Sequence, residues 1–92
     1  MEREFKVGDI VKSTSGHDKN QLFLIISIDK NGYIVIINGK QRTKNKPKLK
    51  NPKHLQLVAH DENLLKTFNS RLSTDTEIHK LIKKHNLNAN EN

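Results

Sequence analysis

Two strand patterns joined by a short polar turn constrain the fold of this chain more than any other feature. The segment over residues 7–28 reads VGDIVKSTSGHDKNQLFLIISI. Within it, Leu22–Ile28 is rich in branched aliphatic residues, which favour strands, whereas Ser15–Asn20 is polar and contains a glycine. Both faces of the Leu22–Ile28 strand are apolar, because Phe23 and Ile25 alternate with the other aliphatic residues. Such a strand is expected in a tightly curled sheet whose outside is partly covered.

Further strand patterns follow this unit along the chain. Asn38-Gly39 predicts a type I′ hairpin turn, in which both central residues need a positive φ, and the next residues would form the returning strand. Lys44–Lys53 contains both prolines, so we expect a basic linker there, because proline cannot donate to a central strand ladder. Short strands with tight turns predict a mainly β fold, namely a small five-stranded SH3-like barrel. The expected strands cover Val7–Thr14, Leu22–Ile28, Tyr33–Ile37, Lys40–Thr43 and His54–Ala59.

The pattern changes from strands to helices after residue 60. Apolar residues recur at helical spacing over Asp61–Arg71, and Asp61 is a suitable N-cap. Thr74-Asp75-Thr76-Glu77 is a capping box, which predicts a second helix over Asp75–His85. We therefore expect the barrel over residues 1–60, one or two C-terminal α-helices over 61–87 and a disordered tail over 88–92.

The helices carry apolar stripes that need a partner surface. We expect them to cover the face of the central strand that carries Phe23 and Ile25; docking of a partner protein is the alternative. The stripe residues are Leu64, Leu65, Phe68, Ile78, Leu81 and Ile82.

The positive charge is concentrated in one region. The chain has a formal net charge of +7, and residues 30–60 contain eight Lys or Arg and no acidic residue, so the remainder nets to −1. A focused basic surface favours nucleic acid or an anionic membrane. No basic amphipathic helix or lipidation motif accompanies the charge, so we expect no membrane attachment. A solvated charged linker is the alternative to nucleic-acid contact.

No motif indicates catalysis or a metal site. The chain has no Cys, and its five His are scattered without the spacing of a zinc site. We recognise no pairing of a nucleophile with a base and no glycine-rich phosphate loop. The start of the chain is charged and leads into a strand pattern, unlike a signal peptide. We expect a cytoplasmic, monomeric, non-enzymatic protein without cofactors or metals.

Two short runs in the opening unit carry a resemblance to a known family. Gly8-Asp9-Ile10-Val11 and Gly16-His17-Asp18-Lys19, followed by the apolar strand, resemble the KOW motif. With the linker and the helix that begins at Thr74, most of the chain resembles bacterial KOW-domain RNA-binding proteins, which are similar to SH3-like-barrel large-subunit ribosomal proteins of archaea and eukaryotes. Asn20 departs from the usual glycine, although Asn also tolerates a left-handed conformation.

The resemblance implies non-catalytic binding of structured ribosomal RNA or of the ribosome. Aromatic residues are few, which favours contact with the RNA backbone over base stacking. We interpret Asp18 as a turn former that bonds to nearby backbone N–H groups. Two alternatives remain, a protein-docking KOW module of the transcription or translation machinery and a general DNA-binding accessory protein. The candidate RNA-binding residues are Lys12, Gly16, His17, Lys19 and Asn20 in the first unit, and Lys40, Arg42, Lys44, Lys46, Lys48, Lys50 and Lys53, six of which alternate along residues 40–50.

Overall fold

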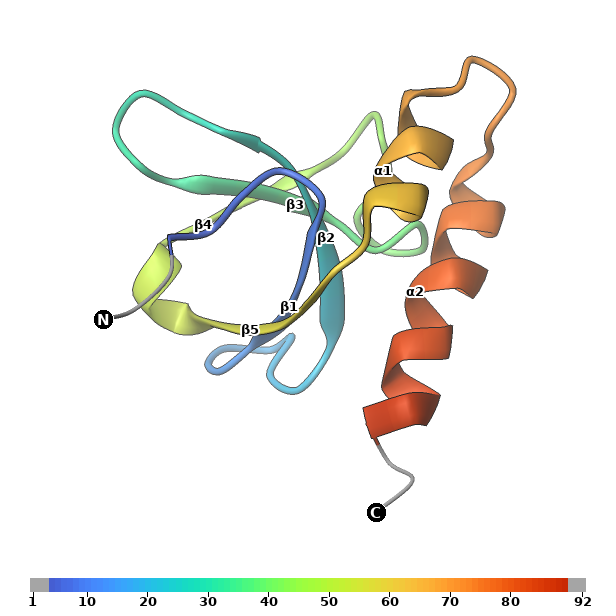
Figure 1. The fold of residues 1–92 in the computed structure, drawn as a ribbon. Coiled ribbons are helices and arrows are strands. Elements are labelled where there is room, and N and C mark those ends of the chain that lie inside the picture. Colours follow the sequence, from blue (N-terminus) through green and yellow to red (C-terminus); the bar gives the residue numbers. More distant parts are fainter. Residues whose placement is uncertain (1–3, 90–92) are drawn as a thin grey trace.

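The computed structural model describes residues 4–89 as one antiparallel five-stranded sheet with two helices beside it (Figure 1). The strand order is β4-β3-β2-β1-β5, and the sheet is open. A mainly β fold with C-terminal helices is therefore confirmed. The elements are β1 (Asp9–Ser13), β2 (Leu22–Ile28), β3 (Ile34–Ile37), β4 (Lys48–Lys50), the short 3-10 helix η1 (Pro52–His54), β5 (Leu55–His60), α1 (Glu62–Asn69) and α2 (Asp75–Ala89).

The hairpin expected at Asn38-Gly39 is wrong. Gly39 has a positive φ of 80°, but Asn38 does not, so the pair cannot form a type I′ turn. No strand forms over Lys40–Thr43; β3 pairs instead with β4, which comes from the segment expected to be a linker. Because β4 is an edge strand, proline is tolerated immediately before it, at Pro47.

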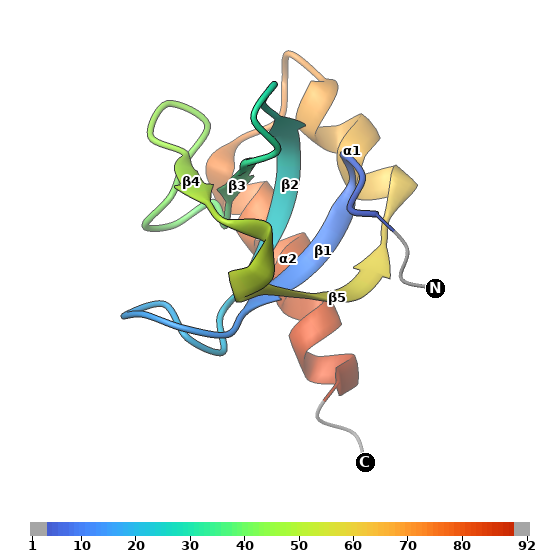
Figure 2. The same ribbon diagram turned by 90° about the vertical axis from the view of Figure 1, so that its left-hand side faces the viewer.

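The apolar side chains form two clusters, one on each side of the sheet. One cluster consists of strand residues alone, with Phe5 packed against it: Val11, Phe23, Ile25, Ile34, Ile36 and Leu55. The other joins strands to helices: Ile10, Leu22, Leu24, Ile37, Leu64, Ile78 and Ile82. Figure 2 shows both helices behind the same side of the sheet.

The expected assignment of the two faces of β2 is therefore reversed. The helices cover the face that carries Leu22 and Leu24, whereas Phe23 and Ile25 point into the cluster formed by strands alone. In a strand, alternate side chains point to opposite faces, and in β2 both sets are apolar. The sequence pattern alone therefore does not identify which face the helices cover. A register shift between Ile25 and Ser27 also breaks the alternation.

The two helix starts agree with the sequence prediction. The side chain of Asp61 accepts a hydrogen bond from the Leu64 N–H at 2.9 Å, and Thr74 Oγ1 accepts one from the Glu77 N–H at 3.1 Å. The second helix continues to Ala89, so residues 88 and 89 are helical where we expected disorder. The rest of the expected tail, residues 90–92, lies outside the described residues. Across residues 4–89, neither helix is both long and apolar enough to cross a membrane.

Two histidines connect the helices to the sheet and to each other. His60, at the end of β5, contacts Asp9 Oδ1 through Nδ1 at 2.7 Å and Glu62 Oε1 through Nε2 at 2.8 Å. Hydrogen bonds to Glu62 and Asp9 raise the pKa of His60 above its ordinary value. His85 Nε2 lies 2.7 Å from Asp61 Oδ2, which ties the far part of α2 to the start of α1. The helices are therefore an integrated part of the fold.

The loop after β3 packs tightly against the start of α2. A Cβ atom placed on Gly39 would lie against the Asp75 carbonyl oxygen and 2.7 Å from the His79 nitrogen. His79 Nδ1 also donates a hydrogen bond to the Asn38 carbonyl oxygen at 3.0 Å. Only glycine combines the positive φ with this close backbone approach.

We expect Gly39→Ala to destabilise the protein by about 3 kcal/mol, from left-handed strain combined with the clash against α2. Gly32→Ala is the matched control, because Gly32 also has a positive φ (87°), but no atom of the described residues around it lies within 4 Å of a Cβ built there. The control should lose only about 1 kcal/mol. Urea unfolding measures both values, and equal losses would contradict this account of the Gly39 contact.

Candidate nucleic-acid interface

The loop between β1 and β2 is held in a defined shape by its own backbone. The Asn20 N–H donates to the Ser13 carbonyl at 2.8 Å, and the Gln21 N–H donates to the Asp18 carbonyl at 3.0 Å. Gly16 and Asn20 both have positive φ values, 87° and 73°. The left-handed conformation expected of Asn20 is confirmed, so the turn tolerates Asn at this position.

A buried carboxylate joins this loop to β4. Asp18 Oδ1 accepts hydrogen bonds from Ser13 Oγ at 2.7 Å and from Lys50 Nζ at 2.9 Å, and Asp18 Oδ2 accepts one from Lys48 Nζ at 2.7 Å. Burial favours a raised pKa for Asp18, but the hydrogen bonds from Lys48, Lys50 and Ser13 outweigh it and hold the pKa well below the ordinary value of 3.8. We expected Asp18 to bond to nearby backbone N–H groups; its carboxylate instead binds side chains from two strands. We call these four residues the Asp18 clamp.

The Asp18 clamp uses two of the candidate RNA-binding lysines. Lys50 is only 9% exposed and also donates to the Ser15 carbonyl at 3.0 Å. Lys48 is half-buried. Their ammonium groups therefore face the β1–β2 loop. These contacts indicate that both lysines chiefly neutralise the buried charge of Asp18.

A third candidate, Lys44, is bound to the connection between the two helices. Its N–H donates to Asp75 Oδ1 at 2.9 Å, and its ammonium donates to the carbonyl oxygen and the hydroxyl of Ser73. The same ammonium lies 5.4 Å from the centre of the Phe68 ring, within the range of a cation–π contact. The expected line of alternating cations on one side of an extended segment is thus absent, because residues 40–47 form a loop.

The remaining basic side chains of the two loops are exposed. The side chains of His17, Lys19, Lys40, Arg42 and Lys46 are all exposed, and within the described part of the chain none of them forms an ion pair. A hollow of about 250 Å³ lies between the two loops and is lined by His17, Arg42 and Lys48 among others. The fold therefore brings the first candidate segment next to the second.

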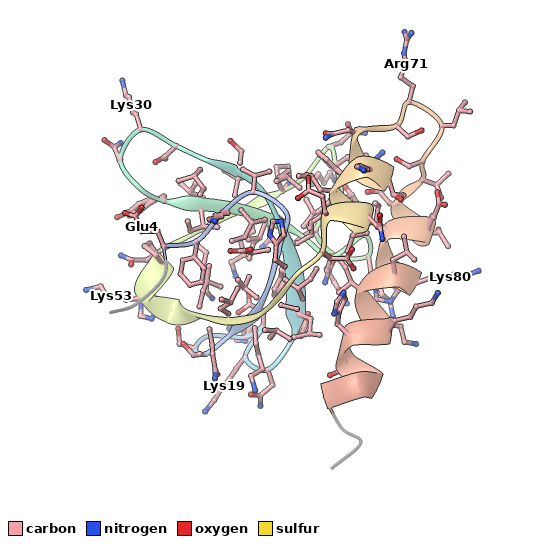
Figure 3. All side chains as sticks on the ribbon, in the orientation of Figure 1. Glu4, Lys19, Lys30, Lys53, Arg71 and Lys80 are labelled. Carbon is pink, nitrogen blue, oxygen red and sulfur yellow. The ribbon has the colours of Figure 1, made fainter. Side chains whose placement is uncertain are left out.

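Two candidates have other surroundings. Lys12 is half-buried on β1, between its strand partners Leu22 and Gln56. Lys53 lies on η1, and Figure 3 shows that it projects from a different side of the molecule than Lys19. The structure therefore brings together a subset of the predicted residues rather than one continuous stripe.

A group of carboxamides between the loops was missed by the sequence prediction. Asn38 is 4% exposed, and its Oδ1 accepts hydrogen bonds from the Lys40 N–H at 2.9 Å and the Arg42 N–H at 3.0 Å. Its Nδ2 donates to Gln41 Oε1 at 2.9 Å and lies 3.5 Å from Gln21 Oε1. Gln21 and Gln41 each follow a predicted turn closely, which is the only sequence signal for this group.

Comparison with known proteins gives no family assignment. No protein-family model matches the chain, and no curated protein matches it. The KOW resemblance therefore depends on the residues quoted above. Over residues 4–89, no three His, Cys, Asp or Glu residues are grouped so that they could hold a metal ion.

We expect Asp18→Asn to lower the free energy of unfolding at pH 7 by about 3 kcal/mol, because Lys50 is left buried without its counter-charge. The lowered pKa of Asp18 sets the pH dependence. The carboxylate stabilises the fold above its unfolded pKa of 3.8, and this contribution is lost as the pH falls toward the lower folded value. The difference between wild type and variant should therefore shrink from pH 6 to pH 2.

Urea unfolding monitored by circular dichroism at several pH values measures this difference. Asp29→Asn is the control, because within residues 4–89 the Asp29 carboxylate accepts hydrogen bonds from backbone N–H groups alone, those of Asn31 and Tyr33 in a separate turn. The control should lose clearly less stability at pH 7. A constant difference between wild type and Asp18→Asn from pH 6 to pH 2 would contradict the role given to the ion pairs.

Proposed function

We propose that this protein is a non-catalytic KOW-type module that binds structured RNA of the ribosome through its β1–β2 loop and the loop after β3. The observation that carries the proposal is the proximity of these two loops, which carry the exposed basic residues His17, Lys19, Lys40, Arg42 and Lys46, around one hollow that His17 and Arg42 help to line. Phosphate contacts of this kind need positive side chains on a fixed scaffold rather than a deep cavity.

The topology supports the SH3-like part of the proposal. Strands β1, β2 and β3 are antiparallel neighbours in chain order, and β4 pairs with β3 at one edge. The last strand, β5, pairs with β1 at the other edge. A short connection through η1 joins the two edge strands. This is the strand order that a small SH3-like barrel requires, and the left-handed Asn20 suits the position of the KOW glycine.

The contacts that some lysines make within the protein reduce the number of residues that we propose to bind RNA. Lys44, Lys48 and Lys50 have partners within the protein, so they support the loops more than they attract phosphate. The phosphate contacts proposed here are made mainly by the exposed cations Lys19, Lys40, Arg42 and Lys46, with His17 beside them.

We expect a triple variant, Lys40→Gln, Arg42→Gln and Lys46→Gln, to bind a folded ribosomal RNA fragment much more weakly than wild type. Each phosphate contact releases condensed cations, so the slope of log affinity against log salt should fall by about two to three units. Fluorescence anisotropy at rising salt measures affinity and slope together.

The matched control replaces three exposed lysines elsewhere, as Lys30→Gln, Lys66→Gln and Lys80→Gln. It removes the same charge, and Figure 3 shows Lys30 and Lys80 projecting from different parts of the surface. Equal effects of the two triple variants would mean that net charge alone drives binding. Affinity that does not change with salt would contradict phosphate contact.

Two further results would favour the alternative functions. Tighter binding to duplex DNA than to the folded RNA, in direct competition, would favour a DNA-binding accessory protein. Co-sedimentation with ribosomes that survives removal of accessible RNA by ribonuclease would favour a protein-docking module.

A further inference from the structure

A second hollow lies on the other side of the carboxamide group, against α2. We call it the carboxamide groove; it encloses about 260 Å³ between the β1–β2 loop, the loop after β3 and one face of α2. Leu22 and Ile82 supply apolar surface, and the remaining lining is polar or basic, without a carboxylate among the described residues. The other lining residues are Asn20, Gln21, Asn38, Lys40, Gln41, His79, Lys83 and Asn86.

Hydrogen bonding fixes which atoms two glutamines present here. The backbone N–H groups of Lys40 and Arg42 can only donate, so the Asn38 atom that faces them must be the oxygen. The Asn38 nitrogen therefore faces Gln41 at 2.9 Å and Gln21 at 3.5 Å, and it requires an oxygen from each. The NH₂ groups of both glutamines are then left to donate to a ligand, and both glutamines line this groove as well as the hollow beside His17 and Arg42.

The walls of the groove are held in place without a ligand. His79 donates to the Asn38 carbonyl from α2, and Gly39 lies against the same helix. The Lys44 N–H binds Asp75 at the helix start. A site formed in advance loses less conformational freedom on binding, which favours specific recognition.

The two lysines of the groove come from different elements. Lys40 lies on the loop after β3 and Lys83 on α2, and both are exposed and make no ion pair within the described part of the chain. The groove is thus lined by apolar side chains, amide donors and ammonium groups, which match the three parts of a nucleotide: the base face, the base edge and the phosphates.

We propose that the carboxamide groove binds one unpaired nucleotide of the RNA, and that it prefers guanine. Guanine presents two adjacent acceptors, O6 and N7, whereas adenine presents an acceptor beside an amino donor that would face the glutamine NH₂ groups. The inference depends on the proposed RNA binding and deepens it. Besides contacts to the RNA backbone, the protein would recognise a base in a bulge or loop of the RNA.

The test uses the whole protein and three versions of one RNA hairpin: without a bulge, with a single bulged guanine, and with a bulged adenine. Wild type should bind the guanine bulge about tenfold more tightly than the other two hairpins. The double variant Gln21→Glu and Gln41→Glu keeps an oxygen for the Asn38 nitrogen but replaces both NH₂ donors with acceptors, so it should lose this preference. Its added negative charge should weaken binding of all three hairpins alike. Gln56→Glu, at an exposed glutamine on β5, is the control and should keep the preference.

A second pair of variants tests the phosphate contact without changing the amides. Lys83→Gln should weaken binding of the guanine-bulged hairpin and reduce its salt slope by about one unit, whereas Lys80→Gln should not, because Lys80 lies outside the groove lining. Figure 3 shows Lys80 projecting away from the sheet.

The possible outcomes separate the two proposals. Equal affinity of wild type for all three hairpins, or a guanine preference that survives in the double variant, overturns the groove inference and leaves backbone binding intact. Failure to bind any of the hairpins at low salt overturns the RNA-binding function itself, and the groove's ligand with it.

Discussion

One buried carboxylate determines how the two cationic loops meet. Asp18 is 9% exposed, and taking a charge out of water at this depth costs several kcal/mol unless it is paired. Each of its oxygens faces an ammonium group of β4, and one also accepts from Ser13. The β1–β2 loop is thereby fixed to β4 at the edge of the sheet. The loop after β3 leads directly into β4, so the same contacts set its position next to the β1–β2 loop.

The sequence predicts local features well, and β2 illustrates why. The bounds Leu22–Ile28 agree with the prediction because strand preference is set by neighbouring residues. The positive φ of Asn20 was also expected, from the family glycine that it replaces. The partners of Asp18 were not, because Lys48 and Lys50 lie 30 and 32 residues further along the chain. A pattern of alternating lysines describes charge, but only the fold determines which charges are neutralised.

The loop after β3 shows how tertiary contacts override a strong local signal. Asn-Gly favours a two-residue hairpin, yet the Asn38 carboxamide captures two backbone N–H groups beyond the turn and closes a wider loop. α2 packs against Gly39 and accepts the Lys44 N–H at Asp75, which holds that wider loop in place. The candidate site therefore depends on a helix that the sequence indicated as a cover for the sheet or a docking surface, but not as part of this site. The wider loop also brings Gln41 to the carboxamide group.

The division of the lysines into buried and exposed groups has a consequence for how salt acts on the protein. Exposed charges are screened strongly at high ionic strength, whereas buried pairs are screened much less. Lys50 and Asp18 belong to the second group, and Lys40 and Lys46 to the first. High salt should therefore screen the exposed lysines but leave the Asp18 clamp closed. If the proposed RNA binding is lost at high salt, the loss would then report the phosphate contacts themselves, because the loops that carry them keep their positions.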